Sequence, residues 1–126
     1  MKYFKLNVHR FPDVKFEVFI YQNRRAMRKG IDSKYPCGKH IEKNSKTEAL
    51  AHFCNCREKT VGLFFNVDDF TPGNVAHEAQ HVMLTLFGKS FKNRRYAVKI
   101  HNAEKEEAIC TVTGDFVDAI YKGYND

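Results

Sequence analysis

The chain has 126 residues, of which 43% are hydrophobic and 13% aromatic, and its formal net charge is +6. This length suffices for one domain with a buried core and is short for two, so we expect residues 1–126 to form a single domain. No run approaches the roughly 18 apolar residues of a membrane span, and the N-terminus lacks the apolar core of a signal peptide. We therefore expect a cytoplasmic protein without a membrane partner.

Basic residues gather in three stretches, at residues 24–29, 39–46 and 89–95. A surface of this sign favours anionic partners. Stacking aromatic residues are not interleaved with the charges as they are in many nucleic-acid-binding segments. A solvated basic face is therefore the plainer interpretation, and nucleic acid is only weakly supported as a partner.

The first two apolar runs predict a β-hairpin. Residues 3–9 alternate between polar and apolar, residues 15–21 are rich in β-branched and aromatic side chains, and a Pro-Asp pair separates the two runs. Asn23 is placed to cap a short basic helix that ends near Gly30. Residues 31–47 are polar and show no period, which predicts a loop.

A second strand pair is expected at residues 49–56 and 60–67, giving a sheet of about four strands. A helix should follow, because Thr71 has the chemistry of an N-cap and Pro72 suits the first helical position. Gly88 accepts the left-handed conformation common at helix C-termini, which predicts the end of this helix.

The capping of this helix also involves its neighbours, since Asn74 could return a contact to Thr71 and Phe70 could pack on Val75 as a hydrophobic staple. Downstream, residues 96–100 could form a short strand. Asn102 is a candidate cap for a last helix that runs to about Lys122.

The sequence His-Glu-Ala-Gln-His occupies residues 77–81, inside the helix predicted after Thr71. Two histidines four residues apart lie on one helical face, so His77 and His81 can reach one zinc ion at about 2.0–2.1 Å. Glu78 would project toward the open side of the metal, where a carboxylate can take a proton from a zinc-activated water and pass it to the leaving amine. The alternative is two partly exposed histidines on an ordinary core helix.

Residues 75–82, Val-Ala-His-Glu-Ala-Gln-His-Val, and residues 107–114, Glu-Ala-Ile-Cys-Thr-Val-Thr-Gly, resemble the small gluzincin-type zinc metallopeptidase domains that bacteriophages and mobile elements encode. The resemblance covers residues 60–122 and extends weakly to the preceding hairpin. It implies an α+β, zincin-like fold, in which a small, twisted, mostly antiparallel sheet packs on an active-site helix and a C-terminal helix. Zn²⁺ as cofactor, a peptide or protein substrate, and a glutamate of the second helix as third ligand are also implied.

Glu107 is the predicted third ligand, ahead of Glu104 and Glu106. In the family a small residue follows the ligand glutamate by three positions, and only Glu107 keeps that pattern. The helical stripe of Glu107 is small or polar and would let this helix approach the histidine helix closely; it comprises Cys110, Thr111, Gly114 and Asp118. The stripe of Glu106 is more apolar, and the argument for Glu106 is that a buried carboxylate needs a metal to offset its desolvation.

The leading hypothesis is hydrolysis of peptide bonds by a zinc-activated water, with an extended peptide added to an edge strand beside the active-site helix. Val61 to Val67 is a candidate for that strand, and a fully paired interior strand is the equal alternative. Candidates for a transition-state donor are Tyr96, His101 and Tyr121. The runner-up function is an inactive zincin-fold binding protein, an anti-repressor or nucleic-acid-associated accessory factor that uses the basic face.

The four cysteines, Cys37, Cys54, Cys56 and Cys110, are too few and too irregular for a disulfide scaffold, and thiols are expected. Residues 37–40 and 54–56, with His52, could supply ligands for a structural zinc, but the spacing is unusual and scattered thiols are favoured. Cys110 as a nucleophile with His101 or His77 is a further alternative, and a small helix-packing role suits it better.

Overall fold

The structure is a computed structural model that describes residues 1–34, 48–54, 59–88 and 103–126. These segments form four strands, three α-helices and one 3-10 turn. In chain order they are β1 (Lys2–Leu6), β2 (Lys15–Tyr21), α1 (Arg24–Lys34), β3 (Leu50–Cys54), β4 (Thr60–Asn66), η1 (Val67–Asp69), α2 (Pro72–Phe87) and α3 (Ala103–Asn125).

The four strands form one mixed sheet in the order β1-β2-β4-β3. The predicted pairs are confirmed, since β1 is antiparallel to β2 and β3 is antiparallel to β4. The two pairs join through a parallel contact between β2 and β4, in which Val18 lies opposite Leu63. The fold is therefore α+β, and its central pairing is parallel within a sheet that was expected to be mostly antiparallel.

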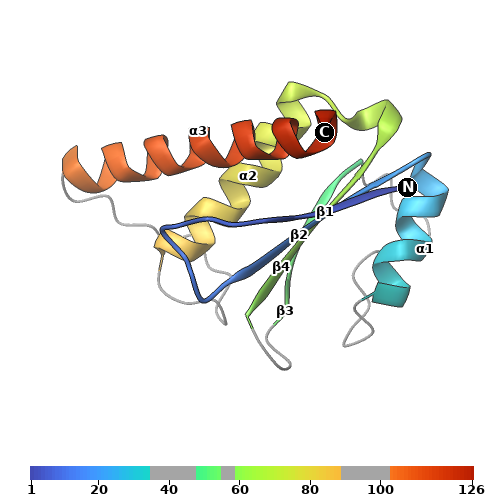
Figure 1. The fold of residues 1–126 in the computed structure, drawn as a ribbon, viewed down its shortest axis with the longest axis horizontal. Coiled ribbons are helices and arrows are strands. Elements are labelled where there is room, and N and C mark those ends of the chain that lie inside the picture. Colours follow the sequence, from blue (N-terminus) through green and yellow to red (C-terminus); the bar gives the residue numbers. More distant parts are fainter. Residues whose placement is uncertain (35–47, 55–58, 89–102) are drawn as a thin grey trace.

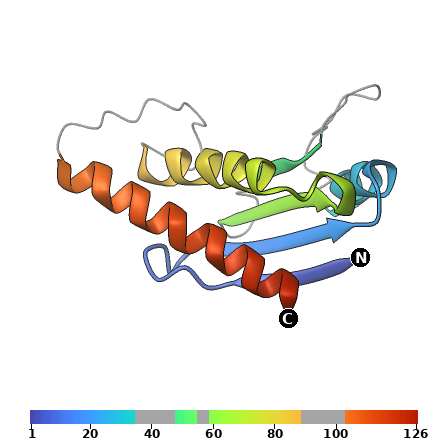
Figure 2. The same cartoon turned by 90° about the horizontal axis from the view of Figure 1, so that it is seen from above.

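Helices α2 and α3 cover one face of the sheet, and α1 covers the other, as Figures 1 and 2 show. Alternation along β2 explains this division, because Phe16, Val18 and Ile20 face α2 and α3 whereas Phe19 faces α1. All the residues of β4 are buried, as expected for a strand that is paired on both edges and covered on both faces.

Asn23 caps α1 as predicted, with its Oδ1 accepting a hydrogen bond from the Ala26 amide at 2.8 Å. The helix does not end near Gly30, however, and continues to Lys34, so the first residues of the predicted loop are helical. Gly30 lets the Tyr21 ring lie close to the backbone of α1, because a Cβ at this position would overlap the Tyr21 hydroxyl group. Residues 35–47 lie outside the described residues.

The start of α2 follows the prediction, because the Thr71 hydroxyl accepts a hydrogen bond from the Asn74 amide at 3.2 Å and Pro72 occupies the first turn. The Asn74 side chain does not return a contact to Thr71. It donates instead to the Asp69 carbonyl at 2.8 Å and to Glu48 at 3.2 Å. These bonds fix the entry of α2 to η1 and to the segment just before β3.

At its other end α2 stops at Gly88 as predicted, but Gly88 has φ −73° and does not use the left-handed conformation. Helix α3 runs three residues beyond the predicted end at Lys122. It lies close to β1, where a Cβ at Gly123 would be 2.3 Å from the Phe4 ring. The predicted strand at 96–100 and the predicted cap Asn102 lie outside the described residues.

No helix in the described part of the chain contains an apolar stretch long enough to cross a membrane.

Candidate metal centre

His77 and His81 lie one turn apart on α2, and their imidazole rings converge. The Nε2 atoms are 3.0 Å apart, and the ring centroids are 4.7 Å apart with an interplanar angle of 77°. The same ring nitrogen of each histidine therefore lies within hydrogen-bonding distance of the other, close enough for both to reach one ion. The His77 side chain is 67% exposed, so this position is open to solvent.

The geometry of this pair fits a tetrahedral zinc ion. Zinc–nitrogen bonds of about 2.0–2.1 Å at a tetrahedral angle separate two ligand nitrogens by about 3.3 Å. The observed separation of 3.0 Å is close to that value. The residues present would accept the ion with only a small opening of the two rings, and imidazole is a ligand that zinc prefers.

Glu78 completes a group of three side chains whose potential ligand atoms all lie within 4.8 Å of one another. Its carboxylate is 3.8 Å from His77 Nε2, yet the residue is only 7% exposed. Burial raises the pKa of Glu78 above its usual value, and the nearby imidazoles and a hydrogen bond from the Ala51 backbone amide oppose that rise. Glu78 is thus a buried carboxylate at the edge of an open imidazole pair.

Ala51 is a contributor that the sequence did not reveal. It belongs to β3, and its amide donates to the Glu78 carboxylate across the contact between β3 and α2. A backbone donor has no residue signature, and the strand expected beside the helix was Val61 to Val67, so no sequence signal pointed to Ala51. Glu78 therefore lies against the edge of the sheet.

Glu107 is not in this group in the structure: it is exposed near the start of α3, as is Glu106. The stripe that was expected to pack on α2 is also exposed, and a Cβ at Gly114 would meet nothing within 4 Å. The close-packing argument for Glu107 is therefore wrong, because α3 buries Ile109, Phe116 and Ile120 instead. Glu107 as third ligand stays a prediction, and the side chain of Glu104 lies outside the described residues.

Tyr121 is the one proposed donor that the structure describes, since Tyr96 and His101 lie outside the described residues. Its ring is 5.2 Å from that of Phe70, just before the start of α2. Within the described residues its buried hydroxyl has no hydrogen-bond partner, and burial raises its pKa. No described contact joins Tyr121 to the two histidines.

The cysteine alternatives are only partly described. Cys110 is a free, exposed thiol on α3, so the predicted helix-packing role is wrong. His52 is buried in β3, but the side chain of Cys54 and the whole of residues 37–40 and 55–56 lie outside the described residues. The structural-zinc alternative therefore stays untested.

Part of the basic face is neutralised within the chain. Arg24 donates to both carboxylate oxygens of Asp69, at 2.6 and 3.0 Å, and this interaction lowers the pKa of Asp69. Arg24 also lies 3.3 Å from Glu48. At least one cation of the 24–29 stretch thus links α1 to the turn before α2.

The strand that lies at the edge of the sheet beside α2 is not the one that was first considered. β4, which contains most of Val61 to Val67, pairs with β2 and β3, so the interior alternative is confirmed and the edge alternative is wrong. β3 is the edge strand next to α2, and β4 is its only partner in the described sheet. The strand that borders the candidate metal centre is therefore Leu50–Cys54.

No protein-family model, curated protein or solved structure matches this chain.

Proposed function

We propose that this chain is a zinc-dependent metallopeptidase with a zincin-like fold, in which His77 and His81 hold the metal and Glu78 is the general base. The observation that carries the proposal is the 3.0 Å approach of the two Nε2 atoms beside a buried carboxylate, all three groups on one helix. A zinc ion in such a site acidifies a water molecule and polarises a carbonyl group.

Glu78 is suited to move the proton of this reaction. Its carboxylate lies within reach of the histidine nitrogens but is shielded from bulk water, and the Ala51 amide limits its orientations. A general base must be held in place to act in one step and return the proton in the next. Glu78 would take a proton from the attacking water and deliver it to the amine that leaves.

The edge strand β3 provides a way to bind the substrate. An extended peptide that pairs with an edge strand gains main-chain hydrogen bonds irrespective of its sequence. The same strand donates to Glu78 through Ala51, so a peptide aligned along β3 would lie beside the general base. This arrangement favours hydrolysis of an unstructured segment of a protein or peptide.

The test is hydrolysis of fluorescence-quenched unstructured peptides by the zinc-loaded protein and by Glu78→Gln. Gln keeps the shape of Glu but cannot accept a proton, so zinc should remain bound while the rate falls by about 10²- to 10⁴-fold. Gln80→Ala is the matched control, because Gln80 is exposed on the same helix outside the group of three. Its rate should equal that of the parent.

Equal rates for the parent and Glu78→Gln would remove Glu78 from the mechanism. Stoichiometric zinc without hydrolysis of any peptide in the parent would favour the inactive binding protein over the peptidase. In that case the metal would have a structural role, and a fourth protein ligand would be expected to close the coordination shell.

A further inference from the structure

A concave site lies beside α3 near the β1 edge of the sheet, away from the edge strand that borders the histidines. It is a cavity of about 220 Å³ between the β1–β2 connection and the middle of α3. Val8, Val112 and Phe116 contribute apolar surface to it, whereas His9, Arg10 and Asp115 are polar residues of its lining. All the residues that line it belong to the described part of the chain.

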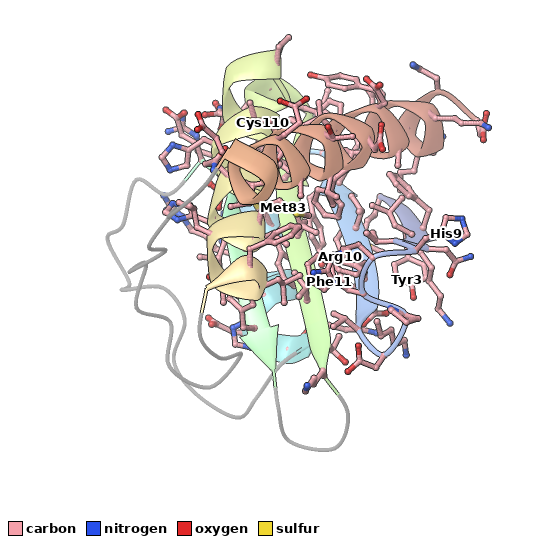
Figure 3. All side chains as sticks on the ribbon, turned by 90° about the vertical axis from the view of Figure 1, so that its left-hand side faces the viewer. Tyr3, His9, Arg10, Phe11, Met83 and Cys110 are labelled. Carbon is pink, nitrogen blue, oxygen red and sulfur yellow. The ribbon has the colours of Figure 1, made fainter. Side chains whose placement is uncertain are left out.

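Arg10 is positioned by aromatic rings. Its guanidinium carbon lies 5.4 Å from the Phe11 ring centroid and 5.2 Å from the Phe87 centroid, and these two rings meet edge to face at 5.2 Å. Figure 3 shows Arg10 and Phe11 close together on this side of the molecule. A guanidinium that lies near aromatic rings still has N–H groups directed away from them, and these can bind a carboxylate in a bidentate manner.

Asp115 supplies the opposite charge from α3. No ion pair joins it to Arg10, and neither residue has another ionic partner among the described residues. Arg10 and Asp115 are both exposed residues of the lining, so a ligand in the cavity could reach a cation and an anion that are not paired with each other. Its apolar surface adds the hydrophobic part of the recognition.

We propose that this cavity binds a free apolar α-amino acid of about the size of leucine, with its carboxylate on Arg10 and its ammonium group on Asp115. The volume sets the size, since a cavity of about 150 Å³ accepts the six carbons of benzene and 220 Å³ scales to about nine non-hydrogen atoms, the number in leucine. The apolar side chain would lie against Val112 and Phe116. This site is independent of the proposed peptidase function.

The test is titration of the isotope-labelled protein with L-leucine, followed by backbone amide shifts in NMR spectra. Saturable shifts should gather at residues 7–10 and 112–119, with a Kd on the order of a millimolar or tighter. An excess of chelator should leave them unchanged, because amino acids can also bind a metal ion. Shifts confined to residues around His77, or no saturable shift, would overturn the proposal.

Ligand analogues separate the two charges without altering the protein. Leucinamide lacks the carboxylate and 4-methylpentanoate lacks the ammonium group, so each should bind at least about tenfold more weakly than leucine, the change expected for loss of one charge-assisted contact. Equal binding of all three compounds would show that the charges are not recognised and would contradict the assignment.

Substitutions of the two charged residues test the same contacts from the side of the protein. Arg10→Gln and Asp115→Asn should each weaken leucine binding by the same factor, and Arg10→Lys should restore part of it. Lys34→Gln and Asp118→Asn are the matched controls, since Lys34 is a cation that also lies over aromatic rings and Asp118 is an exposed carboxylate of the same helix. Controls that weaken binding as much as the two test variants would refute a specific site.

Discussion

Helices α2 and α3 cover the same face of the sheet, but they place their carboxylates in opposite environments. On α2, Glu78 is 7% exposed and accepts a hydrogen bond from the edge of the sheet. On α3, the stripe that begins at Glu107 faces solvent, and the helix buries Phe116 and Ile120. Because an unpartnered buried carboxylate is costly, the burial of Glu78 on α2 is offset by two nearby imidazoles and a backbone amide of β3, which the exposed Glu107 on α3 does not need.

The largest effect on stability should come from the buried face of α3. Phe116 is 1% exposed and packs 5.4 Å from Phe16, ring to ring. Phe116→Ala should lower the free energy of unfolding by about 3–5 kcal/mol, measured by urea denaturation. Asp118→Ala on the exposed face should change it by no more than about 0.5 kcal/mol. Similar losses for both variants would mean that the two faces of α3 are not distinct.

A smaller effect should distinguish the two glutamates at the start of α3. If Glu107 is the third ligand, Glu107→Gln should weaken zinc binding by at least about 100-fold, because loss of a direct ligand costs more than loss of an outer-shell partner. Glu106→Gln should leave the affinity unchanged. A chelator competition assay measures both. Loss of affinity in Glu106→Gln alone would transfer the ligand role to Glu106.

The smallest effect concerns two glycines of α3. Gly114→Ala should raise the free energy of unfolding by about 0.5–1 kcal/mol, because alanine favours the helix and a Cβ there meets open space. Gly123→Ala should lower it, since the added Cβ would overlap the Phe4 ring. Thermal or urea unfolding of the two variants checks the signs. Destabilisation by Gly114→Ala would indicate that this stripe is covered after all.

Local chemistry made the caps and the strand pairs predictable. Thr71 and Asn23 accept the expected amide hydrogen bonds, because a cap depends on residues two or three positions away. The position of the two histidines on one face followed equally from helical geometry, and the structure brings their nitrogens together.

Contacts between distant segments were not predictable from pattern alone. α1 and β3 separate β2 from β4 in the sequence, and no local signal encodes the parallel pairing of these two strands. The end of α1 was misplaced because Gly30 indicates a helix end in sequence but permits the approach of Tyr21 in the fold. For Glu107, helical spacing identified a stripe of small or polar residues, but the direction in which that stripe faces depends on how α3 crosses α2.

The central claim is that His77 and His81 hold a zinc ion, and titration of the metal-free protein with zinc tests it most directly. The parent should bind one zinc ion per chain, and His81→Ala should bind it more than about 100-fold more weakly, because a direct ligand contributes more than an outer-shell partner. His9→Ala, which changes an exposed histidine outside the group of three, should bind like the parent. Undiminished, stoichiometric zinc binding by His81→Ala would contradict the claim.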